Sequence, residues 1–319
     1  MIDISLKQLR YFDAVARLGH FARAADDCCI SQPALSMQIQ NLEQTLGLQL
    51  IERRRDGAKL TDAGRDVAEK ARHILLAMQD LGDVAHNHGH LLTGSLGFGV
   101  IPTLAPYVLP RLLPRLAAEY GLLDLHIRET HTHALIDQLI TGQLDVVLLA
   151  LPVEHTDIET SFLFEDPFLF IQHANADPMH LVHQDSDVLR ASRLLLLEEG
   201  HCLRDQALSL CRPHQAGNVE TFGASSLSTL VQLVANGLGV SLLPEISVPV
   251  ETQRGDVRVV RFADPQPSRS IGLAWRASSQ RKRDFLELGH MIVQCRDANI
   301  EVQALAGVTQ SKRRGRAKT

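Results

Sequence analysis

Residues 31–47 read SQPALSMQIQNLEQTLG and carry the helical pattern that decides the fold of the N-terminal region. Ser31 is a good helix N-cap, Pro33 fits the first turn, and Gly47 ends the pattern. The apolar residues between these ends recur at helical spacing, at Leu35, Ile39, Leu42 and Leu46. A shorter helical stripe comes just before, at Phe21, Ala24, Ala25 and Cys28. The two helices and the break at residues 29–31 between them predict a helix-turn-helix.

The second of these helices would be the element that reads DNA, because its exposed side chains offer hydrogen bonds to base edges and phosphates. These side chains are Gln32, Ser36, Gln38 and Gln40. Residues 50–60 predict a β-hairpin with its turn at Asp56-Gly57 and a basic cluster at Arg53-Arg54-Arg55. A basic hairpin beside a reading helix is a wing that touches phosphate or the minor groove. The same pattern also fits a helical packing module that binds no DNA, and both interpretations stay open here.

A long helix is predicted from Asp62, with helical periodicity from Val67 to Ala85. It exceeds the usual length of a globular helix, which indicates a helix that pairs with a second copy of the chain. The end of the helix carries alternating histidines, at His86, His88 and His90. Residues two apart do not share a helix face, so we interpret them as a solvated helix end and predict no metal site there.

From Leu92 the sequence alternates predicted strands and helices, which is typical of an α/β fold with largely parallel sheets. About 200 residues are generous for one sheet, so we expect two subdomains with a ligand cleft between them. The clusters at residues 152–166 and 264–270 are the expected crossings between the subdomains. The domain prediction is 1–61 for the helix-turn-helix, 62–92 for the linker helix, 93–300 for the α/β domain (subdomains 93–166 plus 269–300, and 167–268) and 301–319 for a disordered basic tail.

The bulk properties restrict the function. The net charge is −5, but residues 1–65 carry nine Lys or Arg against eight Asp or Glu, so the acidic excess lies elsewhere. No apolar run reaches the roughly 18 residues of a membrane helix, and we expect a cytoplasmic protein that contacts no membrane. The five cysteines form no zinc spacing, and no dinucleotide or P-loop fingerprint is present. We therefore expect no metal and no cofactor, and thiols that are reduced at rest.

Two of the five cysteines share the stretch from Glu198 to Cys211. Gly200 ends an apolar run that predicts a buried strand, and helical spacing begins at Cys202. The first turn of a helix favours negative charge, so Cys202 is placed where a thiolate is stabilised. Cys211 falls on the apolar side of the same predicted helix, which indicates burial.

The spacing of Cys202 and Cys211 has a mechanical consequence. Nine positions along a helix separate their Cα atoms by roughly 13 Å, whereas a disulfide requires less than about 7 Å. The two thiols therefore cannot bond while the helix is intact. Either the cysteines are unrelated, or the stretch is a redox switch whose oxidation unravels a helix. The spacing alone favours two unrelated cysteines.

Several stretches of the first domain stand in a characteristic order. They are Leu9-Arg10-Tyr11-Phe12, residues 20–25, residues 30–36, Ile39, Leu42-Glu43, Leu46-Gly47, residues 50–53, Leu60-Thr61 and Ala63-Gly64. Together they resemble the LysR-type transcriptional regulators. The resemblance implies a winged helix-turn-helix, a dimerising linker helix and a two-subdomain α/β effector domain like that of periplasmic binding proteins. It also implies that DNA is contacted by Ser31, Gln32, Pro33, Ala34, Ser36, Gln38, Arg53 and Arg54.

The effector domain is similar to that of the peroxide-sensing members of this family. The similarity rests on Ile101-Pro102-Thr103 with Pro106-Tyr107, Thr132-His133, residues 200–207 with Cys211, and Arg269 with Ile271-Gly272-Leu273. It implies that Cys202 reacts with hydrogen peroxide to give a sulfenic acid and that Cys211 closes a disulfide with it. The implied peroxide pocket consists of Thr103, Thr132, His133, His201, Arg204, Asp205 and Arg269.

The resemblance thus predicts a non-enzymatic regulator of oxidative-stress defence genes. Its expected partners are promoter DNA, hydrogen peroxide as the signal, further copies of the chain in a homodimer or homotetramer, and RNA polymerase. One rival is a LysR-type regulator that binds an organic metabolite in its cleft, with incidental cysteines. A second rival is a thiol peroxidase with no DNA, which would leave the first 90 residues without a role.

Overall fold

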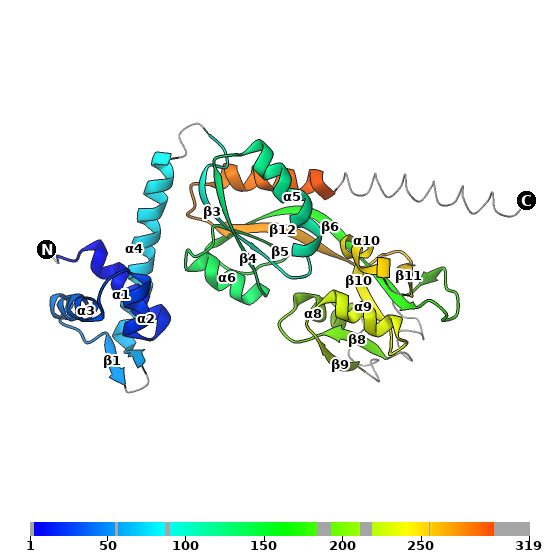
Figure 1. Cartoon of the computed structure of the whole chain (residues 1–319), viewed down its shortest axis with the longest axis horizontal. Coiled ribbons are helices and arrows are strands. Elements are labelled where there is room, and N and C mark those ends of the chain that lie inside the picture. Colours follow the sequence, from blue (N-terminus) through cyan, green and yellow to red (C-terminus); the bar gives the residue numbers. More distant parts are fainter. Residues whose placement is uncertain are drawn as a thin grey trace, which may run out of the picture. The chain divides into compact units, whose positions relative to one another are not determined.

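The computed structural model covers the whole chain and describes residues 3–54, 57–86, 90–183, 193–210, 219–254 and 256–296. The chain forms two compact units, Met1–His88 and Gly89–Thr319 (Figure 1). Within the described ranges, every helix is too short or too polar to span a lipid bilayer.

The first unit is a winged helix-turn-helix followed by a long helix. Its elements are α1 (Leu6–Leu18), α2 (Phe21–Asp27), α3 (Gln32–Leu46), β1 (Ile51–Arg54), β2 (Gly57–Leu60) and α4 (Asp62–His86). β1 and β2 pair antiparallel as a two-stranded wing. The predicted apolar stripes meet in one core, in which Phe12, Leu35, Ile39 and Leu42 are fully buried.

Local signals set the ends of α3. The Ser31 hydroxyl accepts a hydrogen bond from the Ala34 amide at 3.4 Å, which satisfies one unpaired donor of the first turn. Gly47 ends the helix in the left-handed region, with φ 67°. Between α2 and α3 the chain turns at Cys29, a residue with φ 55°. Cys28 packs against the core of the unit, so Cys28 is a packing residue and Cys29 is the turn residue.

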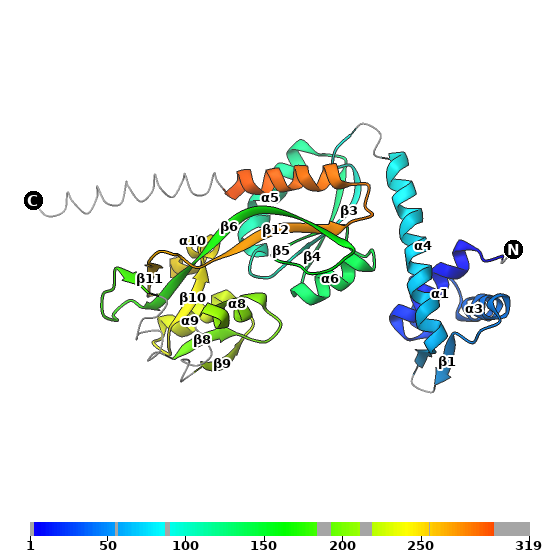
Figure 2. The same cartoon turned by 180° about the vertical axis from the view of Figure 1, so that it is seen from behind.

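In the second unit, the first subdomain surrounds a five-stranded sheet in the order β4-β3-β5-β12-β6. Its elements are β3 (Gly94–Val100), α5 (Ala105–Glu119), β4 (Leu123–Glu129), α6 (Thr132–Ile140), β5 (Val146–Ala150), the first part of β6 (Ile158–His173) and β12 (Ser268–Arg276). Helix α5 and the helical residues 282–296 cover one face of the sheet, and α6 covers the other (Figures 1 and 2).

The second subdomain has its own apolar core. Its elements are the remainder of β6, β7 (Leu181–Val182), β8 (Leu194–Leu197), α8 (Cys202–Leu210), β9 (Val219–Ala224), α9 (Leu227–Ala235), β10 (Ser241–Pro244), η1 (Glu245–Ser247), α10 (Val248–Glu251), η2 (Thr252–Arg254) and β11 (Val257–Phe262). β8 and β9 pair parallel, and a bridge from Leu194 to Val240 links them to the segment before β10.

One strand, β6, belongs to both subdomains. β12 pairs with its residues 158–167, and β10 and β11 pair with its residues 168–173. The predicted crossing at residues 152–166 leads directly into this change of partner, and from Ile158 onward it is a strand. The first half of β6 was not predicted as a strand, because its exposed face carries polar residues. The prediction of largely parallel sheets holds for β3, β4 and β5 but is wrong for β10, β11 and β12, which run antiparallel to β6.

Candidate functional site

A small hollow lies at Cys202, where segments from both subdomains meet. It is lined by Ile101, Pro102, Thr103, His131, Thr132, Gly200, His201 and Cys202. These residues stand where β3, β4 and β8 each lead into a helix. The N-termini of α5, α6 and α8 therefore converge on the hollow, and helix N-termini carry unpaired N–H groups and partial positive charge. The hollow therefore suits an electron-rich small ligand.

Gly200 makes the turn that brings Cys202 into this position. Its φ of 97° lies in the left-handed region that favours glycine. A Cβ atom at this position would lie 3.6 Å from the His131 ring. The turn carries the chain from the end of β8 to the start of α8, so Cys202 is the first residue of that helix and is half-buried.

Two histidines face each other across the hollow. The ring centroids of His131 and His201 are 4.4 Å apart, and the rings meet edge to face at 84°. His201 is 4% exposed. Burial lowers the pKa of His201 below its ordinary value, and the neighbouring His131 lowers it further. The His201 imidazole is therefore neutral at neutral pH.

Three polar atoms of the hollow's lining are buried without a hydrogen-bond partner among the described residues. They are Nδ1 of His131, Oγ1 of Thr132 and Nε2 of His201. Burying a polar atom without a partner costs free energy, so such atoms are rare in folded proteins. Three of them at one hollow indicate a place for a small molecule that both donates and accepts hydrogen bonds.

Arg269 lies behind the hollow and holds Thr103. Its Nη1 donates to the Thr103 hydroxyl at 2.8 Å and its Nη2 to the Thr103 carbonyl at 3.2 Å. The same guanidinium pairs with Asp166 at 2.9 Å. The other Asp166 oxygen accepts the Ile246 amide at 3.0 Å. Arg269 thus fixes the loop between β3 and α5 without lining the hollow itself.

The structure brings Thr103, Thr132, His201 and Cys202 together at one hollow and places other residues of the predicted pocket elsewhere. The His133 side chain is 93% exposed and pairs with Asp137. Asp205 is exposed on α8. Arg204 donates to the Leu197 carbonyl at 3.4 Å, at the end of β8. Cys211, the expected partner of Cys202, lies outside the described residues.

His131 was not predicted from the sequence. It is two positions before His133 and immediately precedes α6. A residue at that position follows a strand and starts a helix, so it lies at the edge where the carboxyl ends of parallel strands meet. This positional signal would have favoured His131 over His133.

The predicted DNA-contacting residues lie on α3 and on the wing. Ser31, Gln32 and Pro33 are exposed, whereas Ala34, Ser36 and Gln38 are partly buried along α3. On β1, the Arg53 guanidinium lies 4.8 Å from the centre of the Phe21 ring. Arg54 pairs with Glu52 at 2.9 Å. Both arginines are exposed, so the wing presents positive charge beside α2.

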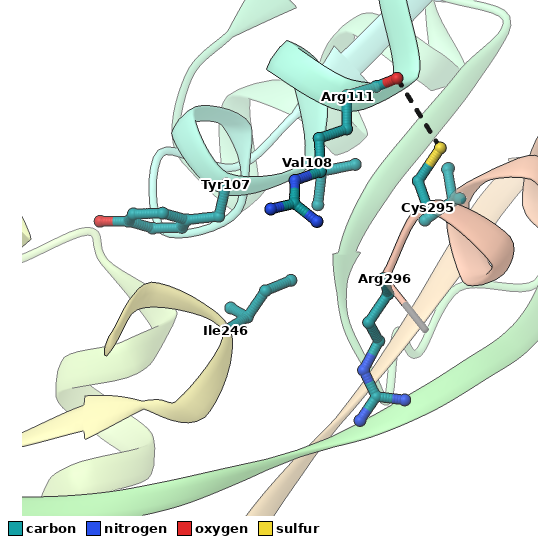
Figure 3. A pocket seen from close by; sticks show the side chains of 7 residues that line it. Tyr107, Val108, Arg111, Ile246, Cys295 and Arg296 are labelled. Carbon is teal, nitrogen blue, oxygen red and sulfur yellow. Dashed lines mark hydrogen bonds between the residues drawn. The ribbon is translucent and has the colours of Figure 1, made fainter. Parts of the chain in front are cut away.

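A second hollow lies between α5, the segment after β10 and the helical residues 282–296 (Figure 3). It is lined by Tyr107, Val108, Arg111, Ile246, Ile292, Cys295 and Arg296. The Cys295 sulfur is buried and lies 3.8 Å from the Arg111 carbonyl oxygen (Figure 3). The Tyr107 hydroxyl donates to Glu251 at 2.7 Å. In the described part of the chain, no group of three His, Cys, Asp or Glu side chains is arranged to hold a metal ion.

Known proteins resemble this chain along most of its length. It is 44% identical over 289 residues to a probable hydrogen peroxide-inducible genes activator of Streptomyces viridosporus, covering 89% of this chain and 92% of that protein. A full-length OxyR mutant from Pseudomonas aeruginosa matches with a TM-score of 0.75 and 36% identity, over 92% of this chain and 99% of the other. A hydrogen peroxide-bound OxyR mutant from Corynebacterium glutamicum matches with a TM-score of 0.64 and 34% identity, over 96% and 99%.

Two family descriptions also match. Residues 6–65 match the bacterial regulatory helix-turn-helix proteins of the lysR family, and residues 89–294 match the LysR substrate binding domain. The predicted fold class, a winged helix-turn-helix followed by a long helix and a two-subdomain α/β domain, is confirmed. The chain therefore belongs to the LysR family of bacterial transcription regulators.

Proposed function

We propose that this chain is a hydrogen peroxide-sensing transcription regulator in which oxidation of Cys202 is the signal. The observation that carries the proposal is the hollow at Cys202, with three helix N-termini and three unpartnered buried polar atoms around one thiol. Hydrogen peroxide is small and has two donors and several acceptor lone pairs, so it suits those atoms. The peroxide-inducible activator and the peroxide-bound OxyR among the relatives support the same chemistry.

The reaction needs only this chain's thiols and peroxide. The Cys202 thiolate sulfur attacks one peroxide oxygen, the O–O bond breaks, and the second oxygen leaves with a proton as water. The product is a sulfenic acid on Cys202. The Cys211 thiolate then attacks that sulfur, hydroxide leaves and takes up a proton, and a disulfide forms.

Disulfide formation would unravel α8. The helix contains 9 residues, Cys202–Leu210, so its ends lie about 12 Å apart along the axis. Cys211 follows Leu210 directly, and a disulfide requires Cα atoms within about 7 Å. Oxidation would thus remove α8 from its place beside β8 in the second subdomain. The signal would pass to DNA as a changed arrangement of subunits.

The DNA-binding surface we propose combines the start of α3 with the wing. Its residues are Ser31, Gln32, Pro33, Ala34, Ser36, Gln38, Arg53 and Arg54. We also propose that α4 pairs two chains, because Ile74, Met78 and Leu81 are exposed apolar residues on this helix. A homodimer or homotetramer on promoter DNA, contacting RNA polymerase, fits this arrangement.

A peroxide pulse on the purified full chain tests the proposal. We expect mass spectrometry to find a Cys202–Cys211 disulfide, and footprinting to find altered contacts on a bound operator selected from a random DNA library. Cys202→Ser should abolish both changes, whereas the control Cys29→Ser, which removes an exposed thiol far along the sequence, should leave them intact.

Four outcomes would contradict parts of the proposal. An unaltered footprint response in Cys202→Ser would exclude Cys202 as the sensor, and a response to organic metabolites instead would favour the rival regulator. A bond from Cys202 to Cys28, Cys29 or Cys295 would exclude the intramolecular switch. Repeated peroxide turnover with no operator binding would indicate a thiol peroxidase.

A further inference from the structure

We propose that His131 donates the proton to the oxygen that leaves when Cys202 reacts with peroxide. The inference rests on the proposed function and assigns to the same site a residue outside the pocket predicted from the sequence. It follows from the placement of the His131 ring in the hollow, from its unpartnered nitrogen and from the stoichiometry of the reaction.

The position of His131 is not explained by folding alone. It is the N-cap residue of α6, yet its side chain makes no capping hydrogen bond. The Nδ1 atom is buried and has no partner among the described residues. An N-cap side chain ordinarily accepts an amide hydrogen of the first turn and so stabilises its helix. His131 gives up that contribution and turns its ring to His201 and the hollow instead.

The reaction requires an acid near Cys202. Attack by the thiolate breaks the O–O bond and releases an oxygen as hydroxide unless a proton arrives in the same step. The balanced step is thiolate plus hydrogen peroxide plus protonated His131, giving sulfenic acid, water and neutral His131. A positioned histidine is the commonest donor for such a transfer.

Of the two facing histidines, His131 is the better placed donor. His201 is almost fully buried, and its environment opposes the charged form. His131 is only partly buried, and its ring lines the same hollow as Cys202. The neutral His201, with its own unpartnered Nε2, would hold the peroxide in place while His131 supplies the proton.

The titratable groups around His131 determine how the rate of Cys202 oxidation would depend on pH. From the β8–α8 connection, His201 and Cys202 face the hollow, and Glu198 interacts with His201. On α6 itself, His133 and Asp137 pair with each other at the surface. Arg269 is held behind Thr103 by Asp166. Among the described residues that line the hollow, His201 and Cys202 are thus the titratable neighbours of His131, and Glu198 acts on His201.

The test is the rate of Cys202 oxidation in the full chain with Cys211→Ser, so that the sulfenic acid persists and is trapped by dimedone. Rates are measured between about pH 5 and 8, the range in which histidine titrates. His131→Gln keeps a hydrogen-bonding side chain but cannot titrate, and His131→Phe keeps the ring alone. His133→Gln is the matched control, because it removes an exposed histidine from the same helix.

We expect both His131 variants to oxidise about 100-fold more slowly, the lower range of general acid catalysis. We also expect them to lose a pH dependence that the His133→Gln control retains. A variant that unfolds at the same temperature as the parent is taken as folded. If either folded variant oxidises at a rate within about threefold of the parent, with an unchanged pH profile, His131 has a packing role and is not the proton donor. Failure of the proposed function looks different, because Cys202 would then not be oxidised in the parent chain either.

Discussion

The guanidinium of Arg269 donates to the hydroxyl of Thr103 at 2.8 Å, although the two residues are 166 positions apart. Arg269 comes from β12 and Thr103 from the loop after β3. Both side chains are buried, and Asp166 on β6 completes the contact. A buried ion pair thus holds the wall of the hollow at Thr103. Substitutions at Arg269 or Asp166 should therefore affect the site although neither residue lines it.

Arg269→Met should destabilise the effector domain by about 3–5 kcal/mol, because it leaves the Asp166 carboxylate buried without its partner. Urea unfolding followed by circular dichroism measures the change. The double variant Arg269→Met with Asp166→Leu should recover part of the loss, since both charges are then removed. A double variant as unstable as the sum of the two single variants would contradict this account.

Gly200→Ala should cost about 1–3 kcal/mol, because φ 97° is strained for a residue with a side chain. It should also slow the reaction of Cys202 with peroxide by shifting the start of α8. Gly121→Ala is the matched control, since Gly121 is exposed and a Cβ there meets no atom within 4 Å. Equal effects of the two substitutions on thermal unfolding would exclude strain at Gly200.

The stability of the effector domain should fall as the pH drops below 6.5, the ordinary pKa of histidine. Folding lowers the pKa of His201. Below pH 6.5 the unfolded chain therefore binds a proton at this residue that the folded chain binds less readily. Above 6.5 both states are neutral and this contribution vanishes. The difference in unfolding free energy between the parent and His201→Gln should therefore change with pH only on the acid side, by at most about 1.4 kcal/mol per pH unit. A difference that is independent of pH would contradict the assignment.

The described cysteines should differ in their reaction with iodoacetamide in the folded chain. Cys29 is exposed and should be alkylated first, followed by the half-buried Cys202. Cys28 should react slowly, because burial raises the pKa of its thiol, and Cys295 is almost inaccessible. Mass spectrometry of timed samples measures the order, with denatured protein as the control in which all cysteines react. Rapid labelling of Cys295 in folded protein would contradict its burial.

Arg53→Ala should weaken binding to operator and random duplex DNA alike, and it should reduce the salt slope of the affinity by about 1. The reason is its place on the wing, where the Phe21 ring supports the guanidinium. Lys70→Ala, on the exposed side of α4, removes the same charge outside the proposed surface and should change neither quantity. Titrations at several salt concentrations provide the measurement, and equal slopes for the two variants would exclude a phosphate contact by Arg53.

How far the sequence predicts this molecule depends on how local each signal is. Ser31, Pro33 and Gly47 determine α3 through their own backbone geometry, so the helix-turn-helix was predictable. The first half of β6 was not, because one of its faces is polar and its pairing with β12 joins residues about a hundred positions apart. In the site, Cys202 and His201 follow from one segment. The strand-to-helix position favours His131, but its place beside His201 depends on α6 and α8 starting at the same hollow, which no local pattern records.

Strand β6 has a consequence for how the effector domain comes apart. It carries two sheets and two hydrophobic cores on 16 consecutive residues, and the pairing partner changes near Pro167. Melting either core removes hydrogen bonds from the same strand, so neither subdomain has an independent boundary at which unfolding can stop. Two cores should therefore melt as one cooperative transition, with amides on both halves of β6 exchanging hydrogen at a common rate.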